Sequence, residues 1–144
     1  MFDKIKGKLI INNVNIGLKF TKEDFLSSNL KDEVISKDEV VSNDGAVHTN
    51  YYLKPQPIGE DQFIVRIYFD PDGKLSELLL SITSDGKTPS WENWSKEQQL
   101  LTKQKNYIWL YKTIGPPPYE FDWGRIISVF DSLSGSSHIR VLYK

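Results

Sequence analysis

The clearest pattern in the chain is a period of two between Phe63 and Ile82. Large apolar residues recur before a short polar segment, at Phe63, Val65, Ile67 and Phe69, and again after it, at Leu75, Leu78, Leu80 and Ile82. The segment between them, Asp70–Gly73, has the Pro and Gly that are typical of a tight turn. This pattern predicts a β-hairpin with one buried face, at the centre of a sheet.

A second hairpin is predicted near the C-terminus. Phe121 to Val129 alternates like a strand, Asp131–Gly135 is turn-like, and His138 to Tyr143 alternates again. Its Val-Phe-Asp and Gly resemble the first hairpin's Tyr-Phe-Asp and Gly. Two related halves, each a helix followed by a hairpin, are one interpretation, and a chance likeness is the other.

Further strands are predicted in the first third of the chain. Gly7–Phe20 alternates as a strand. A six-residue motif, Lys-Asp-Glu-Val-Ile/Val-Ser, then occurs twice from Lys31 to Ser42, and its β-branched residues favour one or two short strands. Asn43–Gly45 predicts a turn that leads into a strand over Ala46–Leu53.

Two helices are predicted from their capping residues. Thr21 with Asp24 nearly matches a capping box and predicts a short helix over Lys22–Ser28. Ser95 with Gln98 is a second match, and it predicts a long helix that runs to Ile114 and stops at Gly115. Its apolar positions form one broad stripe that we expect to face the sheet: Leu100, Leu101, Tyr107, Ile108, Tyr111 and Ile114.

These elements predict an α+β fold: mainly an antiparallel β-sheet of hairpins, with one long helix and one short helix packed on it. The 144 residues, with 39% hydrophobic and 26% charged, suit a single domain spanning 1–144. The chain has no Cys, which excludes disulfides and thiolate metal sites and fits a cytoplasmic location. No apolar stretch is long enough for a membrane helix or a signal peptide, so we expect no membrane partner.

The net charge of −1 hides an uneven distribution. Between Phe20 and Asp85 there are 13 acidic and 6 basic residues, a balance of −7, and the remaining segments carry +6. A nucleic-acid-binding protein usually has an overall basic excess, so we expect no nucleic-acid partner. An acidic middle segment could face a basic partner, or it could be an ordinary solvated surface.

No residue set indicates catalysis, a metal or a cofactor. His48 and His138 have no ligand at a suitable spacing, and nucleophile and phosphate-loop motifs are missing. Carboxylate pairs occur, but in turns and strand edges where solvated acids are expected: Asp32/Glu33, Asp38/Glu39, Glu60/Asp61 and Asp70/Asp72. We therefore expect a non-catalytic protein without cofactors, and a carboxylate hydrolase is one alternative.

Aromatic residues are concentrated between Trp91 and Trp123. Trp109 lies off the apolar stripe of the long helix, so it is either exposed or covers a sheet edge. Trp and Tyr are favoured at protein interfaces, but the same residues could complete the core. A small-ligand-binding module with an aromatic-lined pocket near Trp109 and Trp123 is the first alternative, ahead of the carboxylate hydrolase.

The last third of the chain resembles small bacterial immunity proteins of polymorphic toxin and contact-dependent inhibition systems. The resemblance covers about 50 residues and is carried by Trp91–Trp94, Trp109-Leu, Gly115-Pro-Pro, Phe121–Ile126 and Phe130-Asp-x₃-Gly135. It implies a compact cytoplasmic protein that neutralises a toxin by binding it, and no functional residue is transferred with it.

An immunity protein that binds a basic toxin domain is therefore the function we expect. Its partner-facing surface is predicted to consist of acidic residues and one aromatic residue: Asp32, Glu33, Asp38, Glu39, Asp44, Glu60, Asp61 and Trp109.

Overall fold

The computed structural model describes residues 2–83, 95–131 and 136–144. The fold is α+β with antiparallel sheets, one long helix and one short helix, which confirms the predicted class. In chain order the elements are β1 (Phe2–Asp3), β2 (Lys8–Ile11), β3 (Val14–Ile16), α1 (Lys22–Leu26), the 3-10 helix η1 (Asn29–Glu33), β4 (Val34–Val41), β5 (Val47–Leu53), β6 (Gln56–Ile58), β7 (Asp61–Phe69), β8 (Leu75–Thr83), α2 (Lys96–Ile114), β9 (Glu120–Phe121), β10 (Gly124–Asp131) and β11 (Ser136–Tyr143).

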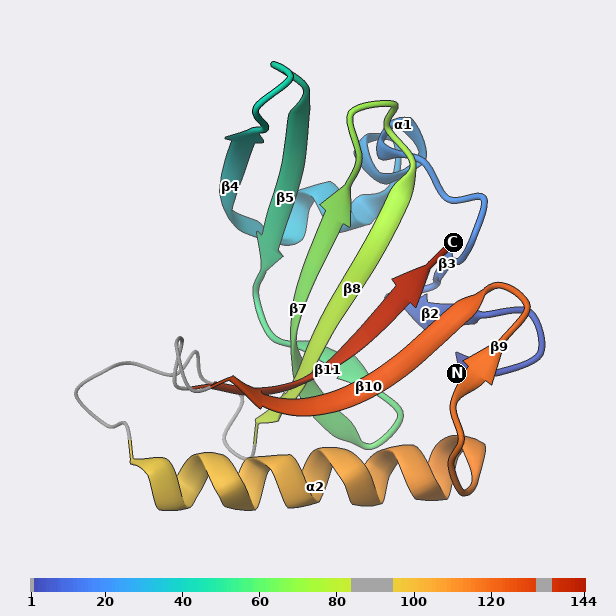
Figure 1. Cartoon of the computed structure of the whole chain (residues 1–144), viewed down its shortest axis with the longest axis vertical. Helices are drawn as coiled ribbons and strands as arrows, with labels where there is room; N and C mark the ends of the chain where they lie inside the picture. Colours follow the sequence, from blue (N-terminus) through green and yellow to red (C-terminus); the bar gives the residue numbers. More distant parts are fainter. Residues whose placement is uncertain (1, 84–94, 132–135) are drawn as a thin grey trace.

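The large sheet has the strand order β4-β5-β7-β8-β11-β10-β9, and β6 also pairs with β7. Its paired strands are antiparallel. As Figure 1 shows, α2 lies along one end of the molecule, and the β4–β5 hairpin projects at the opposite end. This arrangement leaves β4 at the edge of the sheet, furthest from the long helix.

The predicted central hairpin is formed by β7 and β8. The four alternating residues of β7 are all buried, as the period of two requires: Phe63, Val65, Ile67 and Phe69. Gly73 closes the turn with φ +81°, a conformation that glycine adopts without strain. The register shifts between Tyr68 and Phe69, so the buried positions of β8 are spaced irregularly at Leu75, Leu78 and Leu80.

The prediction of one strand over Gly7–Phe20 was wrong. The chain reverses at Asn12 and Asn13, whose φ angles of +50° and +65° suit a tight hairpin turn. β2 and β3 therefore pair with each other and, with β1, form a separate three-stranded sheet. Because Leu9, Ile11 and Ile16 are buried, this small sheet contributes one face to the common core.

The short helix begins where its capping residues predict. The Thr21 hydroxyl accepts a hydrogen bond from the Asp24 N–H, and the Asp24 carboxylate accepts one from the Thr21 N–H, each at 3.0 Å. The helix ends at Leu26, two residues earlier than predicted. Phe25 is its buried residue, and its ring lies 4.7 Å from that of Tyr51 on β5. The helix thus attaches the base of the β4–β5 hairpin to the core.

The long helix forms as predicted, but the prediction of its buried face was wrong. Of the six stripe residues only Ile114 is buried, and the other five are between 46% and 54% exposed. The face that packs against β8, β10 and β11 instead contains Asn106, Trp109, Leu110 and Ile114. Both sides of α2 carry large apolar residues, so the apolar pattern alone could not distinguish them.

Hydrogen bonds fix the orientation of α2. The Asn106 side-chain oxygen accepts a hydrogen bond from the Ile82 N–H, 3.0 Å away, at the end of β8. The Gln99 side-chain oxygen accepts one from the Ser137 N–H, also at 3.0 Å, and the Ser137 hydroxyl donates to the Gln99 carbonyl. The N–H groups of Ile82 and Ser137 find these hydrogen-bond partners only when the face that carries Asn106 and Gln99 is turned inward. This requirement explains why the more apolar stripe faces outward.

The second predicted hairpin is formed by β10 and β11, paired from Gly124 with Tyr143 to Asp131 with Ser136. Most of its predicted turn lies outside the described residues. The two hairpins lie side by side because β8 pairs with β11. In the first half, β4, β5 and β6 stand between the short helix and the hairpin, so a common origin of the two halves stays a prediction.

Candidate functional site

The β4–β5 hairpin, here called the arm, is the most exposed part of the sheet. In the described part of the chain, β4 is hydrogen-bonded to β5 along one side and to no strand along the other. Seven of the eight β4 residues are exposed, so both faces of this strand are in contact with solvent. An edge strand exposed in this way is a natural site for pairing with another chain.

Five of the seven predicted acidic residues lie along this edge. Asp32 and Glu33 are in η1 at the base of the arm, Asp38 and Glu39 are in the middle of β4, and Asp44 is in the turn at its tip. Between residues 29 and 53 five acidic residues face two lysines, a balance of −3. The structure therefore places these five predicted residues along one edge of the sheet, here called the acidic edge.

Glu60 and Asp61 are not part of this edge. They lie where the turn after β6 leads into β7. Asp38 is in register with Asn50, and Asn50 is in register with Tyr68. Tyr68 lies seven positions after Asp61 on β7, a distance of about 23 Å along the strand. Glu60 and Asp61 are thus well separated from the acidic residues in the middle of the arm.

Neighbouring side chains hold the acidic groups of the arm in place. The Tyr52 hydroxyl donates a hydrogen bond to Asp38 at 2.7 Å. Burial, followed by this interaction, raises the pKa of Tyr52 to about 12. Lys37 and Glu39 form an ion pair at 3.0 Å, and their hydrogen bond raises the pKa of Lys37. Because both ends of each contact are exposed or half-buried, these interactions orient the carboxylates without removing them from water.

The turn of the arm is ordered by Asp44. Its carboxylate accepts hydrogen bonds from the Ser42 hydroxyl and from the Ala46 N–H, the latter at 3.0 Å. The hydrogen bond from Ser42, together with that from Ala46, lowers the pKa of Asp44. The carboxylate at the tip is therefore held in its charged form.

Apolar side chains accompany the acidic ones on the arm. Four aliphatic residues are exposed on β4 and the start of β5: Ile35, Val40, Val41 and Val47. Val41, at 64%, is the most exposed of them. Exposed aliphatic residues on a long edge strand favour association, since edge strands are normally protected by charges or by short length. The arm thus combines apolar contact area with negative charge.

The structure places Trp109 in the core. Its side chain is only 8% exposed, and its ring meets that of Phe63 edge-on at 4.8 Å. Trp123 is buried as well, between Phe121 and Tyr143. These two residues pack inside the molecule, so neither is available for the partner contact or the aromatic pocket that the sequence suggested. Trp91 and Trp94 lie outside the described residues.

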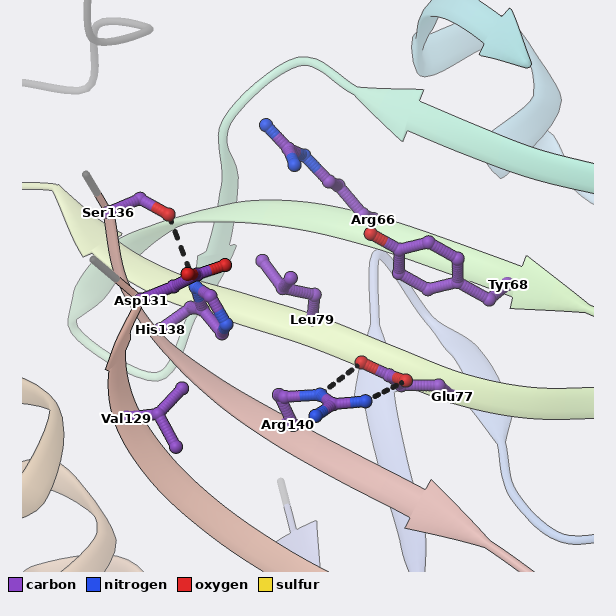
Figure 2. Close-up of a pocket in the computed structure, with 9 residues that line it drawn as sticks. All are labelled: Arg66, Tyr68, Glu77, Leu79, Val129, Asp131, Ser136, His138 and Arg140. Carbon is purple, nitrogen blue, oxygen red and sulfur yellow. Dashed lines mark hydrogen bonds and ion pairs between the residues drawn. The ribbon is translucent and has the colours of Figure 1, made fainter. Parts of the chain in front are cut away.

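A concave polar site, which the sequence did not indicate, lies on the sheet face opposite the core (Figure 2). Its volume is about 490 Å³, and it is lined by residues of β7, β8, β10 and β11: Arg66, Tyr68, Glu77, Leu79, Val129, Asp131, Ser136, His138 and Arg140. Arg66, Leu79 and Arg140 form one row across three strands. The site depends on strand pairing between distant segments, and none of the predicted carboxylate pairs lines it.

An ion pair lies within this site. Arg140 donates two hydrogen bonds to Glu77, each at 2.8 Å, in a bidentate arrangement. Arg66 lies over the Tyr52 ring, 4.8 Å from its centroid, and so connects the site to the arm. Burial and the adjacent Arg140 lower the pKa of His138, whose Nδ1 lies 3.3 Å from the Ser136 hydroxyl. His138 is therefore held in its neutral form.

Neither a metal site nor a membrane-spanning helix is found in the described residues. Residues 2–83, 95–131 and 136–144 contain no group of three or more His, Asp or Glu placed to hold a metal ion. In the same ranges, no helix has the length and apolar character needed to cross a membrane.

Comparison with known proteins provides no relative for this chain. No family model matches it, and neither a curated protein nor a solved structure is significantly similar to it. The resemblance to immunity proteins therefore stays a prediction.

Proposed function

We propose that this protein is a non-catalytic, cytoplasmic binding protein of the immunity type, which neutralises a basic toxin domain by binding it through the arm. The observation that carries the proposal is the exposure of β4, an eight-residue edge strand that presents acidic and aliphatic side chains together. Such a strand offers a partner both a backbone edge and a charged surface.

Each feature of the arm has a distinct role in the proposed complex. The carboxylates attract a basic domain and accelerate its encounter with the arm. Unpaired N–H and C=O groups on the outer side of β4 can then bond to a strand of the partner, since alternate residues of an edge strand direct these groups outward. Ile35, Val40 and Val41 add apolar area that is buried on contact.

The base of the arm is rigid, which favours binding. Tyr51 on β5 is buried, and its ring lies 4.7 Å from Phe25 and 6.0 Å from Phe69. On the opposite face, Tyr52 contacts both Asp38 and Arg66. Because the strand pair is held on both faces, less conformational entropy is lost on binding than with a flexible loop.

The proposal predicts that a gene beside that of this chain encodes a large secreted protein with a basic toxin domain, and this domain is the partner in the test. Association with the immobilised domain is measured at low and at moderate salt for the unaltered chain and for Asp38→Lys/Glu39→Lys. We expect association to slow about tenfold or more at low salt, with a smaller difference at moderate salt because exposed charges are screened.

Glu60→Lys/Asp61→Lys is the matched control. It changes the net charge by the same amount, but its residues lie about 23 Å further along the strands. Association of this control is expected to slow much less. If association slows equally for both variants, the effect comes from the net charge of the protein and not from the arm. If association of the Asp38/Glu39 variant is unchanged, the arm has no role in binding. Thermal unfolding of each variant checks that the loss of the Tyr52 hydrogen bond has not unfolded the hairpin.

A further inference from the structure

The outward face of α2 carries an apolar stripe that remains open to solvent in the described structure. At 100° per residue, its five apolar side chains fall within an arc of about 120°, which also contains the exposed Gln104 and, in the first turn of the helix, Glu97. They are Leu100, Leu101, Tyr107, Ile108 and Tyr111, each about half exposed. The opposite face holds α2 on the sheet, so this stripe has no part in the core described above.

Lysines border the stripe on both sides. Lys96 and Lys103 lie about 20–40° beyond one margin of the arc, and Lys105 and Lys112 lie about 20–40° beyond the other. With Glu97 as the only acidic residue of the helix, α2 carries a balance of +3. An apolar stripe flanked by lysines is typical of helices that lie in the plane of an anionic membrane surface, where the ammonium groups reach the lipid headgroups.

A further exposed apolar residue lies near the C-terminal end of α2. Lys4 donates a hydrogen bond to the Ile114 carbonyl at 3.1 Å, which places the turn between β1 and β2 beside the C-terminal end of α2. Ile5 in this turn is 76% exposed, and Lys4 and Lys6 flank it. Two neighbouring elements thus present exposed aliphatic groups bordered by lysines.

Charge is divided between the two ends of the molecule. The arm together with η1 at its base has a balance of −3 over residues 29–53, whereas α2 has a balance of +3. Figure 1 shows these two elements at opposite ends of the longest axis. Near an anionic surface, this distribution turns α2 toward the surface and the arm away from it.

A second copy of the chain fits this face less well. The five side chains expose roughly 500 Å² in total, which is less than the roughly 800 Å² per partner of a stable protein interface. Two such helices packed against each other would also bring their flanking lysines together. The face is basic, and an anionic lipid surface is complementary to that charge.

We propose that the outward face of α2, together with the turn around Ile5, binds the surface of an anionic lipid membrane peripherally. This proposal is independent of the toxin partner, although it would direct the arm toward the solution. The sequence led us to expect no membrane partner, but that expectation rested on the lack of a spanning segment, which surface binding does not require.

Sedimentation of the full chain with lipid vesicles tests the proposal. One set of vesicles is phosphatidylcholine alone, and in the other about one lipid in three is phosphatidylglycerol. We expect binding to the anionic vesicles that weakens with salt, and little binding to the neutral ones. Leu101→Ser/Ile108→Ser and Lys105→Gln/Lys112→Gln should each reduce the partition constant about tenfold or more.

Val40→Ser/Val41→Ser is the matched control, because it removes two equally exposed aliphatic side chains from the other end of the molecule. Its binding to anionic vesicles should be unchanged. Absence of binding to anionic vesicles, or equal binding by Leu101→Ser/Ile108→Ser, would overturn the proposal. A concentration-dependent dimer that this same variant abolishes would assign the face to a second copy instead.

Discussion

Replacing Trp109 by Ala distinguishes a core residue from a partner-binding residue. The side chain is 8% exposed, so it buries roughly 200 Å². At about 25 cal/mol per Å² this burial corresponds to about 5 kcal/mol, an upper value because unfolded chains also bury some surface. Trp→Ala changes in protein cores cost about 3–5 kcal/mol. We therefore expect Trp109→Ala to lower the free energy of unfolding by about 3–5 kcal/mol.

Urea unfolding followed by far-UV circular dichroism measures this change. Trp109→Phe keeps a ring against Phe63 and should lose clearly less. Tyr111→Ala is the control on the outward face of α2, and its cost should stay below about 1 kcal/mol. If Trp109→Ala and Tyr111→Ala were equally stable, the assignment of the buried face of α2 would be wrong, and Trp109 would return to the set of surface residues.

Two further predictions concern stability. Gly124 has φ +155°, and an added Cβ would lie 1.9 Å from the Leu142 carbonyl oxygen. Gly124→Ala should therefore lower the free energy of unfolding, measured in urea, by about 3 kcal/mol or more. Gly45 has open space around it, so Gly45→Ala should lower the same free energy by only about 1 kcal/mol. The pKa of His138 is lowered by burial and by Arg140, so folding favours its neutral form, and stability is lost as the pH falls below its unfolded value of about 6.5. The free energy of unfolding of the unaltered chain, relative to that of His138→Gln, should therefore decrease between about pH 7 and about pH 5; a constant difference would contradict the assigned environment of His138.

The local pattern of the sequence determined the two main hairpins and the first residue of each α-helix. Alternation in β7 was sufficient because strand side chains point to opposite faces in turn, whatever the rest of the fold does. Thr21 and Ser95 identified the helix starts because a cap satisfies backbone N–H groups within a few residues. The exposed acidic residues of β4 were also evident, since an edge strand of this composition cannot be buried.

Tertiary structure decided which apolar residues are used. α2 has large side chains on both faces, and the hydrogen bonds that Asn106 and Gln99 accept from distant strands select the buried face. The same selection moved Trp109 into the core and left Tyr111 outside. The polar site around Arg140 and Glu77 joins strands about 60 residues apart in the chain, and a period of two in each strand carries no information about its neighbour. Secondary structure is thus determined within short segments of the sequence. The surfaces proposed here for the protein partner and for the membrane form only when those segments pack together.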